Sequence, residues 1–170
     1  MILGMSLSAF TLLHVVISLI GIGTGLIVAA AMLRSKAPNG WTALFLATTV
    51  LTSVTGFLFP ADKILPSHIV GAISLVVLAI ALVALYGFHL ARSWRWIYVT
   101  TALFALYLNC FVLVAQAFLK VPFLKTLAPT QSDPPFIIAQ VAVMAAFILL
   151  GIKALGSFHR EADQAALRPV

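Results

Sequence analysis

The sequence predicts an all-α fold, a polytopic membrane helix bundle with five transmembrane helices. Of its 170 residues, 63% are hydrophobic and only 8% are charged, whereas an ordinary soluble domain has about 25% charged residues. Five segments each supply close to the ~20 apolar residues that a helix needs to cross ~30 Å of hydrocarbon. Clusters of proline, glycine and charged residues separate these segments. Lipid is therefore expected to cover most of the protein surface.

The five expected spans belong to a single domain, residues 1–156. They cover residues 7–32, 41–59, 68–90, 96–119 and 136–155. The first segment lacks a basic leading region and is too long for the apolar part of a secretory signal, so we expect it to be a span. Polar residues dominate positions 157–170, which are expected to form a cytoplasmic tail.

Breaker clusters set the limits of the later spans. They occupy residues 34–40, 60–67, 91–95 and 120–135. The last of these is the longest connection and contains four prolines, Pro122, Pro129, Pro134 and Pro135. Because proline fixes φ and removes an N–H donor, this connection is expected to be rigid and extended. It is either a lid over the outer mouth of the bundle or only a connector between two helices.

The distribution of Lys and Arg predicts the orientation, because cytoplasmic loops carry an excess of these residues. With the N-terminus outside and the C-terminus in the cytoplasm, seven cations lie inside and three outside. The inner set is Arg34, Lys36, Arg92, Arg95, Lys153, Arg160 and Arg168, and the outer set is Lys63, Lys120 and Lys125. Trp41, Trp94 and Trp96 then share the cytoplasmic interface, which suits their amphipathic rings. The net charge of +6 thus reflects topology and does not indicate a nucleic-acid partner.

Small and polar residues recur at helical spacing on four spans, and such faces normally pack inward. These stripes are Thr11, His14, Ser18, Gly21 and Gly25 in the first span, Thr49, Ser53 and Gly56 in the second, Ser67, Gly71 and Ser74 in the third, and Asn109 and Gln116 in the fourth. Gly21 and Gly25 make a GxxxG step, which predicts close packing within the bundle or a homo-oligomer formed through this face.

Four long polar side chains on four helices fall in the outer half of the bundle. They are His14, His68, Gln116 and Gln140. A polar group buried in hydrocarbon costs several kcal/mol unless it is satisfied, so these groups are expected to converge on one pocket. Ser18 and Asn109 are expected to line the same pocket.

The histidines are the main candidates for chemistry. The spans contain no acidic residue, which argues against a proton-coupled carrier. The sequence also lacks HExxH, GxSxG and CxxCH motifs, so it supports no hydrolase and no covalent haem. Non-covalent haem b needs only axial ligands in an apolar bundle, and His14 with His68 is the candidate pair. His89 and His159 form a second pair, for which solvated interface histidines are the simpler interpretation.

The sequence leaves three functions open and specifies no enzymatic activity. The first is binding of haem b or another redox cofactor, with the pocket admitting a quinone or small apolar ligand. The second is a non-enzymatic protein that binds a lipid or protein partner in the membrane. The third is a passive channel or solute carrier. Cys110, the single cysteine, lies in an apolar run and is expected to be a small core residue.

Several local strings carry a resemblance. They are Thr55-Gly56-Phe57, Pro66-Ser67-His68, Arg95-Trp96-Ile97-Tyr98, Leu108-Asn109 and Ala128-Pro129-Thr130-Gln131-Ser132. The chain resembles a family of small predicted bacterial inner-membrane proteins of unknown function, from its second span to its fifth. The resemblance implies a bacterial inner-membrane bundle. It implies no ligand or activity, and His14 lies outside the part that it covers.

Overall fold

The protein is an all-α bundle in its described part. The computed structural model describes residues 2–36, 39–61 and 65–166, and within these it contains helices and no β-strand. The elements are α1 (Leu7–Met32), α2 (Asn39–Gly56), α3 (Pro66–Leu82), a π-helical turn η1 (Val83–Gly87), α4 (Trp94–Lys120), α5 (Pro122–Leu127) and α6 (Pro134–Ala166). This confirms the all-α class, and the polar residues after 156 continue α6 to Ala166.

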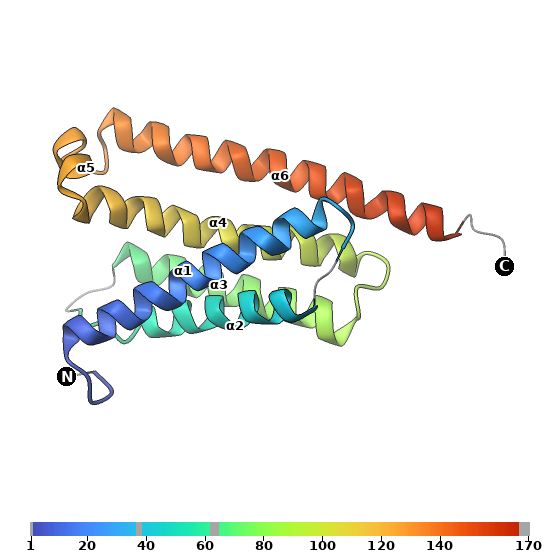
Figure 1. Cartoon of the computed structure of the whole chain (residues 1–170), viewed down its shortest axis with the longest axis horizontal. Helices are drawn as coiled ribbons and strands as arrows, with labels where there is room; N and C mark the ends of the chain where they lie inside the picture. Colours follow the sequence, from blue (N-terminus) through green and yellow to red (C-terminus); the bar gives the residue numbers. More distant parts are fainter. Residues whose placement is uncertain (1, 37–38, 62–64, 167–170) are drawn as a thin grey trace.

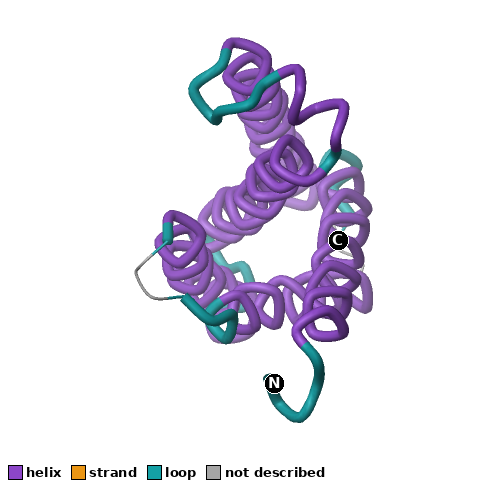
Figure 2. The backbone as a smooth tube through the Cα atoms, turned by 90° about the vertical axis from the view of Figure 1, so that its left-hand side faces the viewer, coloured by secondary structure: helices purple, strands orange, loops and turns teal. Residues whose placement is uncertain are grey.

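The long helices lie roughly along one axis (Figure 1). α2 packs between α1 and α3, while α4 contacts α1, α2 and α3. α6 packs mainly on α4, with a smaller contact to α1, so it stands apart from α2 and α3 when the bundle is viewed end-on (Figure 2). One polar site can therefore form among α1 to α4, while α6 offers a separate surface along α4.

Among the residues that the structure describes, four helices are long and apolar enough to cross a membrane. They are Leu7–Met32, Pro66–Gly87, Trp94–Lys120 and Pro134–Ser157. The expected count of five is not confirmed, because α2 is not among them. Six of the 18 residues of α2 are Ser or Thr, and these hydroxyls lower its mean hydropathy.

The connection between α4 and α6 is not extended as expected. Pro122 occupies the first turn of α5, where the missing N–H costs nothing because it would have had no partner in the helix. Asp133 directly precedes α6, and its carboxylate accepts hydrogen bonds from the Thr130 amide at 2.7 Å and the Thr130 hydroxyl at 2.9 Å. The connection folds at the ends of α4 and α6 (Figure 1), where Ala128 packs in an apolar cluster with Phe118 and Phe136.

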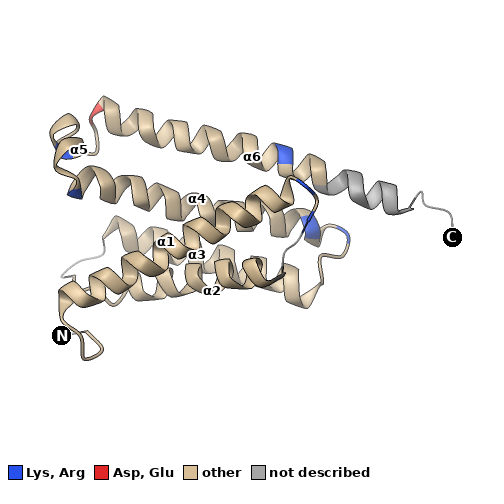
Figure 3. Ribbon diagram, in the orientation of Figure 1, with Lys and Arg blue, Asp and Glu red and all other residues tan. Residues whose placement is uncertain are grey.

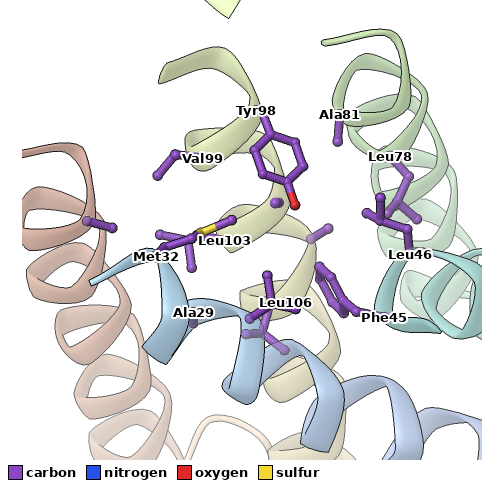
Figure 4. Packing of buried hydrophobic residues seen from close by; sticks show 14 of the residues in the cluster. Ala29, Met32, Phe45, Leu46, Leu78, Ala81, Tyr98, Val99, Leu103 and Leu106 are labelled. Carbon is purple, nitrogen blue, oxygen red and sulfur yellow. The ribbon is translucent and has the colours of Figure 1, made fainter. Parts of the chain in front are cut away.

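The main core fills the half of the bundle where α1 ends and α4 begins. We call its densest part the apolar plug, and it consists of Val28, Met32, Phe45, Leu46, Leu78, Tyr98 and Leu106, each at most 2% exposed (Figure 4). Gly25 touches this plug so closely that a Cβ atom there would lie 2.5 Å from Leu106 Cδ1 and 2.8 Å from Phe45 Cε2. The plug therefore depends on a residue without a side chain at position 25.

The GxxxG face of α1 packs against other helices of the same chain. Gly21 and Gly25 are both buried, and a Cβ at Gly21 would lie 3.2 Å from the Thr48 hydroxyl oxygen of α2. Because α2 and α4 cover this face, Gly21 and Gly25 serve packing within the chain.

Candidate functional site: a polar cavity among four helices

A small polar cavity lies among α1, α2, α3 and α4. Its volume is about 70 Å³. Its walls are formed by His14, Thr52, Ser53, Gly56, Ser67, Val70, Gly71, Ser74, Leu108, Asn109 and Val112. We call it the α1–α4 cavity. None of the residues that line it is Lys, Arg, Asp or Glu, so apart from His14 the wall is uncharged.

The hydroxyls of α2 mostly serve their own helix. Ser53 Oγ donates to the Thr49 carbonyl at 2.9 Å, and the hydroxyl oxygen of Ser74 on α3, 3.1 Å away, is a second acceptor for the same hydrogen. Thr49 Oγ1 likewise donates to the Phe45 carbonyl at 2.8 Å. Since each hydroxyl has only one hydrogen, the hydrogens of Thr49 and Ser53 are already used by neighbouring protein groups.

One hydroxyl in the cavity is an exception. Thr52 Oγ1 is buried and has no hydrogen-bond partner among the described residues. A buried polar group that stays unsatisfied costs about 1–3 kcal/mol. The cavity beside it has room for a few water molecules, since one water needs roughly 10–15 Å³ of such space. Thr52 is thus the group in this cavity most in need of a polar partner from a solute or from solvent.

One tautomer of His14 satisfies all of its contacts with Thr55. Its Nδ1 lies 2.8 Å from the hydroxyl oxygen of Thr55, and the same oxygen lies 2.7 Å from the carbonyl of Leu51. The hydroxyl has one hydrogen and the carbonyl can only accept. Both contacts are hydrogen bonds only if Thr55 donates to Leu51 and Nδ1 of His14 donates to Thr55. In the neutral ring, Nε2 is the remaining acceptor.

Replacing Thr55 with Val should leave the His14 Nδ1–H without its acceptor and destabilise the protein by about 1 kcal/mol. A double-mutant cycle with His14→Leu, measured by thermal unfolding in detergent, should give a coupling energy of similar size. Thr101→Val is the matched control, because the Thr101 hydroxyl donates only to Ile97 and Tyr98 carbonyls of its own helix. Equal losses from Thr55→Val and Thr101→Val would contradict the assigned bond.

His68 does not line the cavity, although its neighbour Ser67 does. It lies in the first turn of α3, where its Nδ1 accepts the Leu65 backbone N–H at 3.2 Å. Its ring stacks on Phe57, with the centroids 5.6 Å apart and the planes 15° from parallel. His68 therefore acts as a helix cap, and sequence reasoning had assigned it a ligand role that this geometry does not support.

The other expected pocket residues are spread over several places. Asn109 does line the cavity, and its side-chain N–H lies 3.5 Å from Thr49 Oγ1. The Ser18 hydroxyl donates to the His14 carbonyl at 2.7 Å, and Gln116 is exposed. Gln140 joins α6 to α4 by donating to the Phe111 carbonyl at 3.0 Å. Of the four long polar side chains expected to converge, only His14 reaches this site.

These residues do not fit haem b. The cavity of about 70 Å³ is far below the roughly 300–1,000 Å³ of pockets that take ligands of ordinary size, and only one histidine of the proposed pair faces it. The part of the chain that the structure describes holds no group of three or more His, Cys, Asp or Glu side chains that could bind a metal. Of the second pair, His89 lies in the exposed α3–α4 turn, and the His159 side chain lies outside the described ones.

The stripes of small and polar residues on the second and third spans predicted this site better than the four long polar side chains did. Ser53, Gly56, Ser67 and Ser74 all line the cavity, as their spacing suggested. Thr52 was missed, because it stands next to Ser53 and off the stripe. Comparison of the chain with family models, with curated proteins and with solved structures found no match, so the site must be interpreted from its own chemistry.

Proposed function

We propose that this chain is a non-enzymatic membrane protein that binds a small, uncharged polar solute in the α1–α4 cavity. The observation that carries the proposal is the buried, unpartnered Thr52 hydroxyl in a cavity with hydroxyl and amide walls. Formal charge is absent from these walls except at His14, so a charged solute would lack a counter-ion. A neutral solute with hydrogen-bonding groups matches both features.

The proposal includes five crossings of the membrane. α1 and α3 run in the same direction (Figure 1), so if both cross the membrane, the chain between them must cross it in return. α2 runs back between them and packs against both. Its 18 residues span about 27 Å at 1.5 Å per residue, close to the ~30 Å of hydrocarbon.

The bias of Lys and Arg supports an N-terminus outside and a C-terminus in the cytoplasm. Most of the cations drawn in Figure 3 lie at the end where α1 finishes and α4 begins. The resemblance to bacterial inner-membrane proteins supports the bacterial inner membrane as the location. In this orientation the cavity lies toward the outer side, because exposed Ser67 in the first turn of α3 belongs to its wall.

The contact between His14 and Thr55 does not make a catalytic dyad. A base that activates a hydroxyl must accept the hydroxyl hydrogen, but here the ring nitrogen donates and the hydroxyl hydrogen goes to Leu51. The arrangement therefore favours a binding role over nucleophilic catalysis.

A continuous channel is also disfavoured. About one helical turn from the cavity, towards the Lys153 end, Leu78 follows Ser74 and Leu106 precedes Asn109. Both leucines are at most 1% exposed and belong to the apolar plug. The cavity is thus closed toward that end. A solute that enters from the outer side would bind in the α1–α4 cavity and leave by the same side without crossing the membrane, as a ligand does at a receptor.

The class of solute follows from the direction of the hydrogen bonds. The Thr52 hydroxyl has no partner among the described residues and can donate its hydrogen to a solute, while His14 Nε2 is an acceptor in the neutral ring. A solute that both accepts and donates hydrogen bonds and is no larger than a few heavy atoms suits this wall. We take acetamide as the probe of this class.

We expect Thr52→Cys, in a Cys110→Ala background, to react with the small neutral reagent methyl methanethiosulfonate and to be protected by acetamide. A buried thiol in apolar surroundings is inert, so the matched control Val28→Cys in the plug should react far more slowly. Ser67→Cys at the mouth should react with a membrane-impermeant thiol reagent in spheroplasts and should resist it in inverted vesicles.

Other outcomes would contradict specific parts of the proposal. Equal rates for Thr52→Cys and Val28→Cys would remove the distinction between cavity and plug. Labelling of Ser67→Cys only in inverted vesicles would reverse the orientation. If acetamide leaves the rates unchanged both at Thr52→Cys and at Val112→Cys, a wall position that keeps the Thr52 hydroxyl, the binding function is wrong.

A further inference from the structure

A second, chemically different surface lies between α4 and α6. It is a groove of about 430 Å³, which is within the size range of ligand pockets. Its walls are almost entirely apolar and consist of Val99, Thr100, Leu103, Phe104, Tyr107, Met144, Phe147, Ile148, Gly151, Ile152 and Leu155. It exists because α6 touches little besides α4, and because Gly151 leaves open space where a Cβ would meet nothing within 4 Å.

A second hollow of about 430 Å³ continues this groove at the Lys153 end of the bundle. Ile152 borders both, and the hollow is otherwise formed by Leu33, Lys153, Gly156 and Ser157. Its walls thus add a cation and a hydroxyl to the apolar walls of the groove. The Ser35 hydroxyl donates to the Ser157 carbonyl at 3.1 Å, which fixes the end of α1 against α6 at this corner.

The length of the groove matches one leaflet of a bilayer. On α6 its walls run from Met144 to Leu155, eleven steps of 1.5 Å or about 16 Å along the helix axis. Half of a ~30 Å hydrocarbon core is about 15 Å. An acyl chain that lies along α4 and α6 would therefore reach from the middle of the membrane to the level of Lys153.

The charges around the hollow at Lys153 favour an anionic lipid headgroup. Among the side chains that the structure describes, the only carboxylate is Asp133, at the opposite end of α6 (Figure 3), so none of them neutralises Lys153. Arg34 follows Leu33 directly at the end of α1, Lys36 lies two residues further on, and both are exposed. Basic pockets between membrane helices bind the phosphate of anionic lipids.

We infer that the α4–α6 groove and the Lys153 corner together bind one anionic glycerophospholipid. One acyl chain lies in the groove beside Phe104 and Phe147, and the headgroup phosphate meets Lys153. This site is separate from the α1–α4 cavity, since the two share no residue. An anionic lipid bound here would hold α6 to the rest of the bundle at a place where protein contacts are few.

The test is competition between phosphatidylglycerol and phosphatidylethanolamine with identical acyl chains, measured by native mass spectrometry of the purified full chain. Both lipids carry a phosphate, but the ammonium group of phosphatidylethanolamine cancels its charge. One cation beside a net anionic headgroup is worth about 1 kcal/mol, so phosphatidylglycerol should bind about fivefold more tightly. Lys153→Gln should bring the two affinities close together. Lys125→Gln, on exposed α5 at the other end of the bundle, should leave the preference intact.

Gly151→Phe tests the acyl chain independently. The new ring should fill the groove and displace several methylene groups, so binding of both lipids should fall by more than about tenfold. Gly23→Phe is the matched control, because Gly23 also meets nothing within 4 Å but lies on α1 away from the groove. Gly151→Leu repeats the test if the thermal midpoint of Gly151→Phe falls below that of Gly23→Phe.

Five results would overturn the inference. Equal binding of the two lipids by the unmodified protein, or a preference that survives Lys153→Gln, would remove the headgroup contact. Unchanged binding in both Gly151 variants would remove the groove. Displacement of bound phosphatidylglycerol by inorganic phosphate alone would indicate a phosphate site, and equal binding of oleate would indicate a fatty-acid site.

Discussion

Replacing Gly25 with Ala should destabilise the bundle by about 1–3 kcal/mol, the usual cost of overpacking a filled core. The added Cβ would lie within 3 Å of Leu106 and of Phe45, and both side chains are only 1% exposed. Neither has space to move away. Gly25→Leu adds three more carbon atoms at the same point and should prevent the bundle from forming.

Gly23 provides a control two residues away on the same helix. A Cβ at Gly23 meets nothing within 4 Å, so Gly23→Ala should be neutral or slightly stabilising through its higher helix propensity. Thermal unfolding in detergent compares the two variants directly. If Gly25→Ala and Gly23→Ala melt at the same temperature, the close contact among α1, α2 and α4 is wrong.

Replacing Phe45 with Ala should cost about 3–5 kcal/mol and open the apolar plug. The Phe45 ring lies between α1 and α4 in Figure 4, near Leu106, and is fully buried. Its removal leaves a void in the apolar plug beside Leu106 and Gly25. Small thiol reagents should then reach Val28→Cys, which the intact plug protects.

Phe123→Ala is the matched control for this change. Phe123 lies on α5 and is 72% exposed, so its truncation should change stability by less than about 0.5 kcal/mol. The thermal midpoint and the labelling rate of Val28→Cys are measured for both variants. A protected Val28→Cys in the Phe45→Ala protein would mean that Phe45 does not close the cavity.

The helices could be predicted because the apolar composition of each segment indicates a helix in a membrane. Runs of apolar residues must become helices in lipid, where every backbone N–H and C=O has to be satisfied within the segment. The first span was exact, since Leu7–Met32 is both the expected and the observed helix. The connection at 120–135 was wrong because proline was treated only as a breaker, although Pro122 starts α5 and proline is favoured in the first turn of a helix.

The site was harder to predict because spacing along a helix does not fix its rotation. One residue corresponds to about 100° around the helix axis, so Ser67 faces the cavity while His68 turns toward Phe57. The expectation that Gln140 lines the pocket was wrong for a different reason. It satisfies its N–H with the Phe111 carbonyl of the adjacent helix, an acceptor that no pattern of side chains reveals.

The hydroxyls of α2 have a consequence for how the protein enters its membrane. A helix with six Ser and Thr residues in 18 gains less from lipid than its neighbours do, although Thr48, Thr49 and Ser53 satisfy their hydrogens on their own helix carbonyls. Its most extensive contacts are with α1. We expect α2 to be retained poorly by the insertion machinery when it emerges alone, and to enter together with α1 as a helical hairpin. Biogenesis would then depend on the pairing of these two helices before α3 is synthesised.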